Sequence, residues 1–274
     1  MKNHFIYSYF GNKRQEVEHI YNNINLDGIN TIIEPFCGSC SLSYYIWSQN
    51  KDKDYKYILN DLDYKLIGLL RLIKEGKCKE LEDGLNDIRQ EILKYENDMI
   101  KAKEIYINYI KNNGLKGYLL SYKCYRIRPA LFPNKDFKRH FNDKKINLST
   151  CPIVEFLTTA NIELYNEDGN KIIEKYDNDK TFIFLDPPYI ASCNNFYSND
   201  NNDNTGNIYE MITNKGLNNF KSKILICHEN NWLFKILFRD YLEGETEYNK
   251  KYQYTTPKKG KKDTSHICVK NYKI

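Results

Sequence analysis

The chain alternates short apolar runs with amphipathic stretches, and this pattern predicts an α/β fold. The run TIIEPF, residues 31–36, is followed by Gly38, small residues and an apolar-rich segment of helical length. The run at residues 55–59 is followed by Asp61 and Asp63 and then by an amphipathic helical pattern. Two strand–loop–helix units in succession predict a parallel, doubly wound sheet.

The alternation is interrupted once, in the middle of the chain. Residues 70–147 read as helical and charged at first, and then as basic, aromatic and proline-containing. The alternation returns in NIELYNED, TFIFLDPPY and SKILICHENNWLF, and two strand-like pieces around a Lys-Gly turn end the chain. We therefore predict one α/β domain, formed by residues 1–69 and 148–274, with an inserted module at residues 70–147.

Composition favours a soluble intracellular protein without a metal site. Among the 274 residues there is no apolar run long enough for a signal peptide or a membrane span. The eight cysteines lie mostly in apolar stretches, as expected for free buried thiols. Cys37 and Cys40 have C-x-x-C spacing, but the sequence has no second pair with ligand spacing, so we expect no metal or redox role.

The net charge of +5 is distributed unevenly along the chain. Lys and Arg gather at residues 123–145 and 250–262. The first run is interleaved with Tyr, Phe and His, and the second with Tyr. Basic and aromatic residues together suit a polyanion whose bases can be stacked upon. Two solvated surface loops would produce the same charge pattern. The Asn-rich stretch 194–207 predicts a mobile loop.

The sequence DPPY follows the predicted strand 182–185. Because proline has no amide hydrogen for a sheet ladder, Pro187 and Pro188 end the strand and present Asp186 and Tyr189 on a stiff turn. A carboxylate and a proline carbonyl can together accept both hydrogens of an exocyclic amine, while a tyrosine ring offers a face to a planar base. The alternative is a strand terminator that carries a surface acid.

Gly38 and Asp61 are candidate ligand contacts at the ends of the first two strands. A glycine loop lets the backbone approach a ligand closely, although small residues also let a helix pack on a sheet. An acid at the second strand end can accept hydrogen bonds from ribose hydroxyls. Its alternative role is a helix cap, for which Asp63 is the better candidate. Ligands of such sheets bind beyond the carboxyl ends of the strands, where Asp168 and Asp186 also fall.

Taken together, these motifs resemble the Dam-type DNA adenine-N6 methyltransferases over nearly the whole chain and in the family's order. The family carries DPPY as its catalytic motif and uses S-adenosylmethionine. The resemblance implies a Rossmann-like methyltransferase sheet, with the target adenine flipped out of double-stranded DNA. It also implies catalytic roles for Asp186, Pro187 and Tyr189.

The resemblance also implies contacts with S-adenosylmethionine. YSYFGNKRQEVEHI is similar to the family's N-terminal cofactor motif, EPFCGSCSLS to its Phe-x-Gly-x-Gly loop, and ILNDLD to the acidic motif that follows. Asp168, the last residue of NIELYNED, resembles an acidic residue that lies near the cofactor adenine in the family. The implied cofactor contacts are Tyr9, Lys13, Phe36, Gly38, Asp61, Asp168 and Asp186.

The position of the insertion resembles that of the family's helical target-recognition domain. In the family a Tyr- and Arg-containing hairpin of this domain enters the DNA, and SYKCYRIRPALFPNKDF occupies that place here. The implied DNA contacts are Tyr122, Tyr125, Arg126 and Arg128. Arginine can read guanine but more often contacts phosphate.

One residue departs from the family pattern. Cys40 stands where the Phe-x-Gly-x-Gly loop has its second glycine. If that position requires a positive φ or a close approach of the ligand, a cysteine there weakens cofactor binding. A non-catalytic DNA-binding homologue or partner subunit is therefore one alternative, and an RNA adenine methyltransferase is another. A third alternative is the methylation of glutamine in proteins. That activity usually goes with Asn in place of Asp186, so the acid found here counts against it.

Overall fold

The structure of the protein is a computed structural model, and its backbone divides into two compact units. One unit contains Met1–Asn12 and Tyr64–Ala160, and we call it the helical unit. The other contains Lys13–Asp63 and Asn161–Ile274, and we call it the sheet unit. The residues that the structure describes are 4–7, 9, 11–125, 146–190, 205–244, 246–253 and 261–273.

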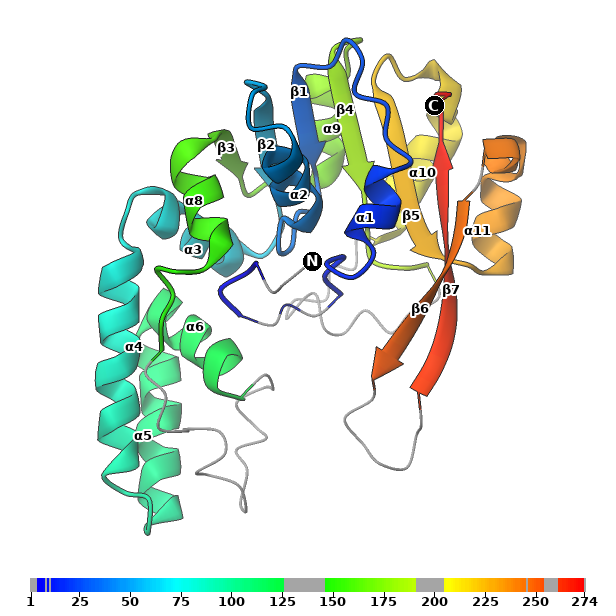
Figure 1. The fold of residues 1–274 in the computed structure, drawn as a ribbon. Coiled ribbons are helices and arrows are strands. Elements are labelled where there is room, and N and C mark those ends of the chain that lie inside the picture. The colour runs from blue at the N-terminus through cyan, green and yellow to red at the C-terminus, as the bar shows by residue number, and fades with distance from the viewer. Residues whose placement is uncertain are drawn as a thin grey trace. The chain divides into compact units, whose positions relative to one another are not determined.

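The described part of the sheet unit contains a seven-stranded sheet in the order β3-β2-β1-β4-β5-β7-β6 (Figure 1). β1 to β5 pair in parallel, whereas β7 is antiparallel to both β5 and β6. β1 lies between β2 and β4, so the chain changes direction across the sheet at β1, where ligands of doubly wound sheets bind. The strands are β1 (Thr31–Glu34), β2 (Lys56–Asn60), β3 (Asn161–Tyr165), β4 (Thr181–Leu185), β5 (Lys223–Glu229), β6 (Thr246–Gln253) and β7 (Lys261–Lys270).

Helices cover both faces of this sheet (Figure 1). α1 and α2 pack on each other at one face, and α9 and α10 pack on each other at the opposite face. α11 follows β5 along the chain. The helices of the sheet unit are α1 (Val17–Tyr21), α2 (Ser41–Gln49), α9 (Gly169–Tyr176), α10 (Thr205–Lys215) and α11 (Trp232–Leu237), with short 3₁₀ helices at Leu217–Asn219 and Arg239–Gly244.

Burial on both faces explains why residues 182–185 of β4 are all apolar. In β4, Ile183 and Leu185 belong to a buried cluster that also contains Ile172 of α9. Their neighbours Phe182 and Phe184 point to the opposite face, because side chains alternate along a strand, and they too are buried. A parallel sheet covered by helices on both sides produces this pattern.

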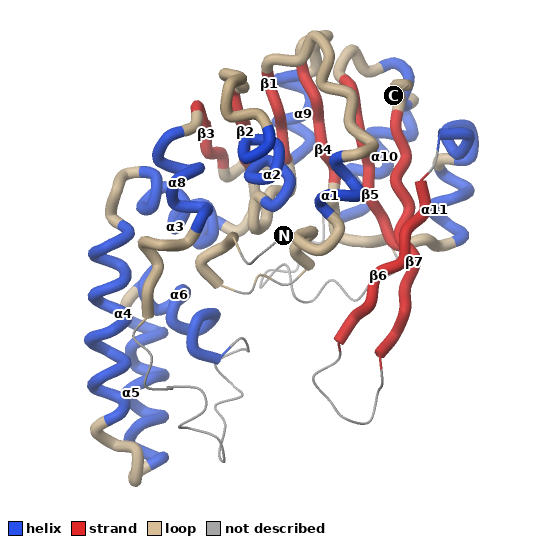
Figure 2. The backbone as a smooth tube through the Cα atoms, viewed as in Figure 1, coloured by secondary structure: helices blue, strands red, loops and turns tan. Residues whose placement is uncertain are grey.

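The helical unit consists, in its described residues, of five helices and an N-terminal segment (Figure 2). α3 packs against α6 and α8, and α4 packs against α5 and α6. Gly117 of α6 allows a close approach to α5, since a Cβ atom there would lie 2.6 Å from the carbonyl oxygen of Ile110. The helices are α3 (Tyr64–Lys74), α4 (Cys78–Leu93), α5 (Met99–Asn112), α6 (Gly114–Tyr125) and α8 (Pro152–Thr159).

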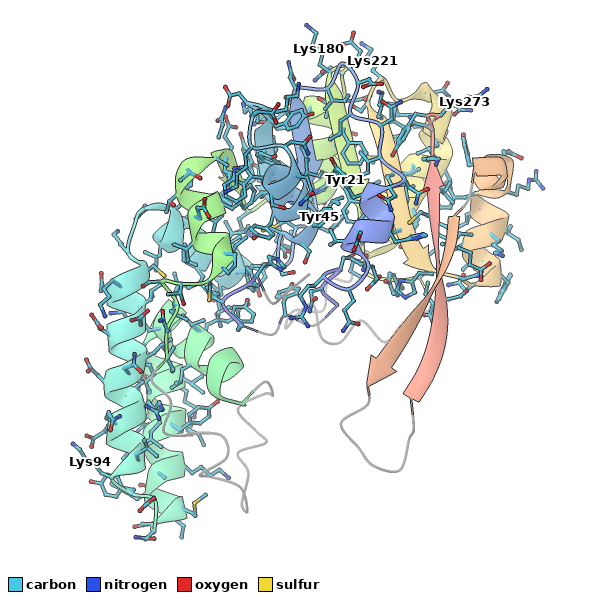
Figure 3. The ribbon with its side chains drawn as sticks, viewed as in Figure 1. Tyr21, Tyr45, Lys94, Lys180, Lys221 and Lys273 are labelled. Atoms are coloured by element: carbon cyan, nitrogen blue, oxygen red, sulfur yellow. The ribbon has the colours of Figure 1, made fainter. Side chains whose placement is uncertain are left out.

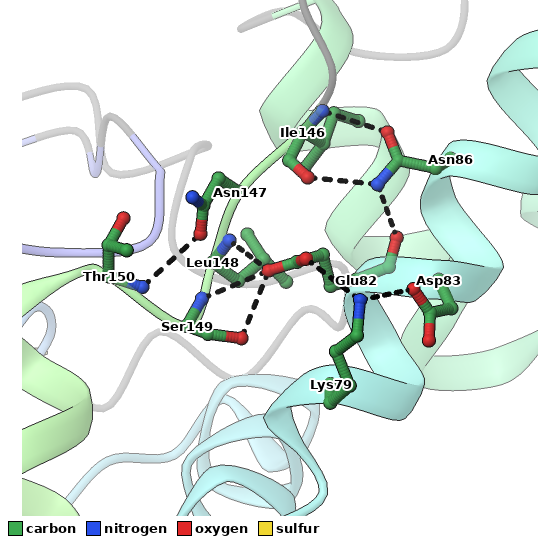
Figure 4. Close-up of polar contacts among 9 residues, drawn as sticks. All are labelled: Lys79, Glu82, Asp83, Asn86, Ile146, Asn147, Leu148, Ser149 and Thr150. Atoms are coloured by element: carbon green, nitrogen blue, oxygen red, sulfur yellow. Dashed lines mark hydrogen bonds and ion pairs between the residues drawn. The ribbon is translucent and has the colours of Figure 1, made fainter.

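Two polar side chains of α4 anchor the segment that returns from the insertion (Figure 4). Glu82 Oε2 accepts hydrogen bonds from the backbone N–H groups of Leu148 (2.9 Å) and Ser149 (3.1 Å). Asn86 exchanges two hydrogen bonds of 2.8 Å with the backbone of Ile146. Both side chains are buried, so the backbone of this segment is satisfied by α4 rather than by water.

The structure confirms the predicted α/β fold with a mostly parallel sheet. β4 ends at Leu185 as predicted from the two prolines, and the two terminal strand pieces form the antiparallel pair β6–β7. The loop predicted at residues 194–207 is wrong at its C-terminal end, because α10 begins at Thr205. The rest of this stretch, residues 194–204, lies outside the described part. No helix in the described ranges is long and apolar enough to cross a membrane.

Candidate active site

Four parallel strands bring predicted site residues to one edge of the sheet unit. β1 leads into Phe36 and Gly38, β2 into Asp61, β3 into Asp168, and β4 into Asp186. Since these strands are parallel neighbours, their carboxyl ends lie at the same edge. This edge is where a ligand of a doubly wound sheet binds.

A buried ion pair joins the N-terminal motif to the DPPY turn. Lys13 Nζ lies 2.5 Å from Asp186 Oδ2 and 3.2 Å from the hydroxyl oxygen of Tyr189. The side chain of Lys13 is 5% exposed and that of Asp186 is 18% exposed, so the lysine is sealed in while the acid still reaches solvent. The pair fixes Oδ2 of Asp186 and leaves Oδ1 outside this contact.

Electrostatics keep Lys13 charged despite its burial. Burial disfavours the ammonium form, but the neighbouring Asp186, Tyr189 and Glu16 outweigh it and raise the pKa of Lys13 well above its ordinary value. Lys13 is therefore a fixed positive charge beside the acid at neutral pH. The family resemblance implied that Lys13 contacts the cofactor, but the sequence did not reveal that Lys13 pairs with Asp186.

The glycine loop and the acid after β2 are bonded to each other. The Gly38 N–H donates to Asp61 Oδ2 at 3.0 Å, and the Asp63 N–H donates to Asp61 Oδ1 at 2.9 Å. Burial raises the pKa of Asp61 to about 6, against the two backbone hydrogen bonds that lower it. Asp61 thus ties together two of the predicted cofactor segments.

Cys40 adopts the backbone conformation for which glycine is preferred. Its φ of 54° and ψ of 34° are left-handed, and it has the only positive φ among the described residues other than glycine. Its side chain is fully buried, and its N–H donates to the carbonyl oxygen of Cys37 at 2.6 Å. Burial raises the pKa of the Cys37 thiol, and the pKa of Cys40 is also raised, so both thiols are protonated at neutral pH.

Glu34 is a site residue that the sequence reasoning missed. It ends β1, is 3% exposed, and its Oε1 accepts the Ser43 N–H of α2 at 2.7 Å. Burial raises the pKa of Glu34 to about 7, although the bond from Ser43 opposes the shift. The glutamate therefore holds the first turn of α2 behind the glycine loop. Glu34 could have been found in the sequence, because it is a single acidic residue inside the apolar run 31–36.

Asn60 connects three strand ends and was also missed. Its Nδ2 donates to the carbonyl oxygens of Pro35 (2.8 Å) and Glu167 (2.9 Å), and its Oδ1 accepts the Glu167 N–H at 2.9 Å. The side chain is fully buried. Asn60 thus sets the spacing between the loops after β1, β2 and β3, which carry the predicted cofactor residues.

Asp168 and Phe36 meet at the start of α9. Asp168 caps this helix, since its Oδ1 accepts the Asn170 N–H at 2.8 Å. Gly169 follows it, and a Cβ atom at that position would lie 2.8 Å from the ring of Phe36. The glycine therefore leaves room for the Phe36 ring at the carboxyl edge. A cofactor contact through Asp168 stays a prediction.

The remaining predicted residues lie in the helical unit or outside the described part. Tyr9 belongs to the helical unit, where its ring is 6.2 Å from those of Phe5 and Tyr7. The backbone of Tyr122 and Tyr125 forms the end of α6, but their side chains lie outside the described part, as do Arg126 and Arg128 altogether. Their contacts with DNA stay a prediction. Within the described ranges no group of three or more His, Cys, Asp or Glu residues could hold a metal ion.

Comparison with known proteins matches the chain to a methyltransferase family and to a viral methyltransferase. The family of D12 class N6 adenine-specific DNA methyltransferases matches residues 9–256. The Type II methyltransferase M.CviBI of Paramecium bursaria Chlorella virus NC1A is 24% identical over 283 residues, which cover 97% of this chain and 99% of the viral protein. The family match spans the glycine loop, the acid after β2 and the DPPY turn.

Proposed function

Because the chain belongs to the D12 class N6 adenine-specific DNA methyltransferase family, we propose that it transfers a methyl group from S-adenosylmethionine to N6 of an adenine flipped out of duplex DNA. The observation that carries this proposal is the DPPY turn at the carboxyl edge, where Asp186 is paired with the buried Lys13. A structural strand terminator needs no buried cation beside its acid.

The residues at the edge suit S-adenosylmethionine. Asp61 and Asp168 can accept hydrogen bonds from hydroxyl and amino groups, and a carboxylate has about four acceptor positions, of which backbone N–H groups occupy two at Asp61. Phe36 offers an apolar ring and Gly38 an approachable backbone. We assign these four residues, with Tyr9, Lys13 and Asp186, to cofactor binding. The cofactor supplies an electrophilic methyl group when it is bound.

The DPPY turn orients the amino group that is methylated. We assign Asp186 Oδ1 and the carbonyl oxygen of Pro187 to accept the two hydrogens of the adenine amine, which directs the nitrogen lone pair away from the turn. Tyr189 offers its ring as a stacking face for the base. Lys13 holds the other oxygen of Asp186, so the carboxylate cannot rotate away. Catalysis by this site is positioning, which accounts for several kcal/mol in well-oriented reactions.

Duplex DNA as the substrate accounts for the basic, aromatic runs. We propose that residues 70–147 form the target-recognition domain and that Tyr122, Tyr125, Arg126 and Arg128 contact DNA. The viral relative, which matches 97% of this chain, is designated a methyltransferase, and this supports methyl transfer as the reaction.

The test measures transfer of tritiated methyl groups from S-adenosylmethionine to unmethylated, AT-rich duplex DNA, followed by mapping of N6-methyladenine. We expect label in adenine with the wild type. Asp186→Ala and Asp186→Asn should lower the rate by about 100-fold or more while the fold stays intact. Asp240→Asn is the matched control, because the Asp240 side chain is 81% exposed on a short 3₁₀ helix. Wild-type rates in both Asp186 variants would refute the assigned mechanism.

The left-handed backbone of Cys40 motivates a test of one alternative function, that of a DNA-binding homologue without catalysis. A homologue that binds DNA without catalysis would lack cofactor binding as well as methyl transfer. Calorimetry with S-adenosylmethionine separates the two, since the methyltransferase must bind the cofactor before it can act. Absence of both cofactor binding and label would favour the non-catalytic homologue.

A further inference from the structure

Two side chains behind the DPPY turn bind its backbone. The hydroxyl of Tyr209, on α10, donates to the carbonyl oxygen of Pro188 at 3.1 Å. The backbone N–H of Ile190 donates to Nε2 of His228, near the end of β5, at 3.0 Å. Neither residue belongs to the DPPY motif, and both lie in the sheet unit with it.

These two hydrogen bonds fix the peptide groups on either side of Tyr189. The carbonyl of Pro188 belongs to the peptide group before Tyr189, and the N–H of Ile190 belongs to the peptide group after it. Because a peptide group is planar, holding one atom of each group restricts both backbone dihedrals of Tyr189. The direction of the Tyr189 side chain is therefore set from behind the turn.

His228 is built to act as an acceptor. Its Nδ1 lies 2.6 Å from the carbonyl oxygen of Glu229 and must donate there, which leaves Nε2 free of hydrogen and able to accept the Ile190 N–H. The ring is stacked on Phe234 with centroids 4.5 Å apart and an angle of 10° between the planes. Burial lowers the pKa of His228 to about 4, with Glu229 opposing and His266 and Lys13 adding to the shift.

The ring of Tyr189 is also held at its sides. The His228 ring lies 4.7 Å from it, centroid to centroid, and covers one side. The Tyr189 hydroxyl lies 3.2 Å from Lys13 Nζ and 3.5 Å from Nδ1 of His266, whose own side chain is buried and paired with Glu16. A ring fixed at its backbone, at one side and at its hydroxyl has little freedom to follow a base that enters the site.

We propose that His228 and Tyr209 are positioning residues that hold Tyr189, and with it the DPPY turn, in the geometry needed for methyl transfer. This inference rests on the proposed function, because it assigns the two residues to the reaction at Asp186. Neither residue touches the reacting atoms. They act by keeping the stacking face and the acceptor oxygens in one arrangement before the adenine arrives.

The test compares three substitutions in the full-length protein. His228→Phe keeps an aromatic ring against Phe234 but removes the acceptor for the Ile190 N–H. Tyr209→Phe removes only the hydroxyl that binds Pro188. His228→Gln supplies an amide oxygen as a substitute acceptor. Tyr241→Phe is the matched control, since its hydroxyl accepts the N–H of Asn218 at 3.4 Å and does not bond to the DPPY turn.

Kinetics of methyl transfer, melting temperature and hydrogen exchange at the Ile190 amide are measured together. We expect His228→Phe to lower kcat by up to about 100-fold, with KM for S-adenosylmethionine within about 3-fold of the wild type, and Tyr209→Phe to lower kcat by about 10-fold. His228→Gln should recover much of the loss, and the Ile190 amide should exchange faster in His228→Phe alone.

The possible outcomes separate this inference from the proposed function. An active wild type whose His228→Phe and Tyr209→Phe variants keep the wild-type kcat overturns the positioning role and leaves the function standing. Loss of kcat in proportion to loss of melting temperature, without rescue by glutamine, assigns both residues to general stability and also overturns it. A wild type that puts no label into adenine overturns the proposed function and the inference with it.

Discussion

At the scale of single residues, the Lys13–Asp186 pair links the stability of the site to its chemistry. Both charges are largely withdrawn from water, and each needs the other to offset the loss of hydration. The same contact leaves Oδ1, the oxygen that we assign to the adenine amine, outside the ion pair. A change at Lys13 therefore acts on the fold and on the proposed reaction together.

Substitution of Lys13 tests this coupling. Lys13→Met should lower the free energy of unfolding by about 3 kcal/mol, because Asp186 is left without its partner. Adding Asp186→Asn to this variant should restore part of the loss, since no uncompensated charge then remains. Urea unfolding of the wild type, both single variants and the double variant gives the coupling energy. Strictly additive effects of the two substitutions would contradict a direct interaction.

Cys40 offers a second test at this scale, because its left-handed backbone disfavours any residue with a Cβ atom. Cys40→Gly and Cys40→Ala both remove the buried sulfur, but only glycine also removes the Cβ atom. We expect the glycine variant to be more stable than the alanine variant by about 1 kcal/mol in urea unfolding. At an ordinary helical position the order is reversed. A more stable alanine variant would show that the loop relaxes to a negative φ.

At the scale of elements, α4 holds the returning chain through a carboxylate. Hydrogen bonds from the backbone of Ser149 and Leu148 outweigh the effect of burial and lower the pKa of Glu82 to about 2. The ordinary pKa of a glutamate in an unfolded chain is about 4.3. The stabilisation by Glu82 is therefore complete above the unfolded pKa and is lost as the pH falls from about 5 toward 2.

The Glu82→Gln variant checks this pH dependence. Near pH 7 it should lower the free energy of unfolding by about 2 kcal/mol, the size of hydrogen bonds to a charged acceptor. The difference from the wild type should shrink as the pH falls below 5. Glu80→Gln is a suitable control, because this acid is 64% exposed on the same helix and its side chain bonds, among the described residues, only to Lys116. A difference that stays constant down to pH 3 would exclude the carboxylate as its source.

Elements could be predicted from the sequence where a local rule dictates them. The two prolines end β4 at Leu185, and the continuous apolar runs of β2 and β4 follow from burial on both faces. Local rules gave no account of His228 or Asn60, because their partners lie far away in the sequence. Polar residues are common at strand ends, and only the folded structure reveals which groups they form hydrogen bonds with.

At the scale of the whole molecule, the order of the strands determines which residues meet. Placing β1 between β2 and β4 brings Asp61 and Asp186 to the same edge as Gly38, although the chain makes its helical insertion between the two acids. The sequence predicted parallel strands but not their order, and the Lys13–Asp186 contact depends on that order. This is why the candidate residues could be predicted and their pairing could not.

The polarity of the sheet also predicts where DNA binds. Lys180 and Lys221 precede β4 and β5, so they lie at the amino edge, opposite to Asp186 (Figure 3). We expect Arg126→Ala and Arg128→Ala to weaken the binding of unmethylated duplex DNA. Each should also reduce the steepness with which the logarithm of the association constant falls with the logarithm of the salt concentration by about 0.9, the amount for one lost phosphate contact. Lys180→Ala and Lys221→Ala should leave both quantities unchanged, although each removes the same charge. Fluorescence anisotropy over a series of salt concentrations measures all four variants. Equal losses in both pairs would mean that the DNA is held by net charge alone and would contradict specific phosphate contacts by Arg126 and Arg128.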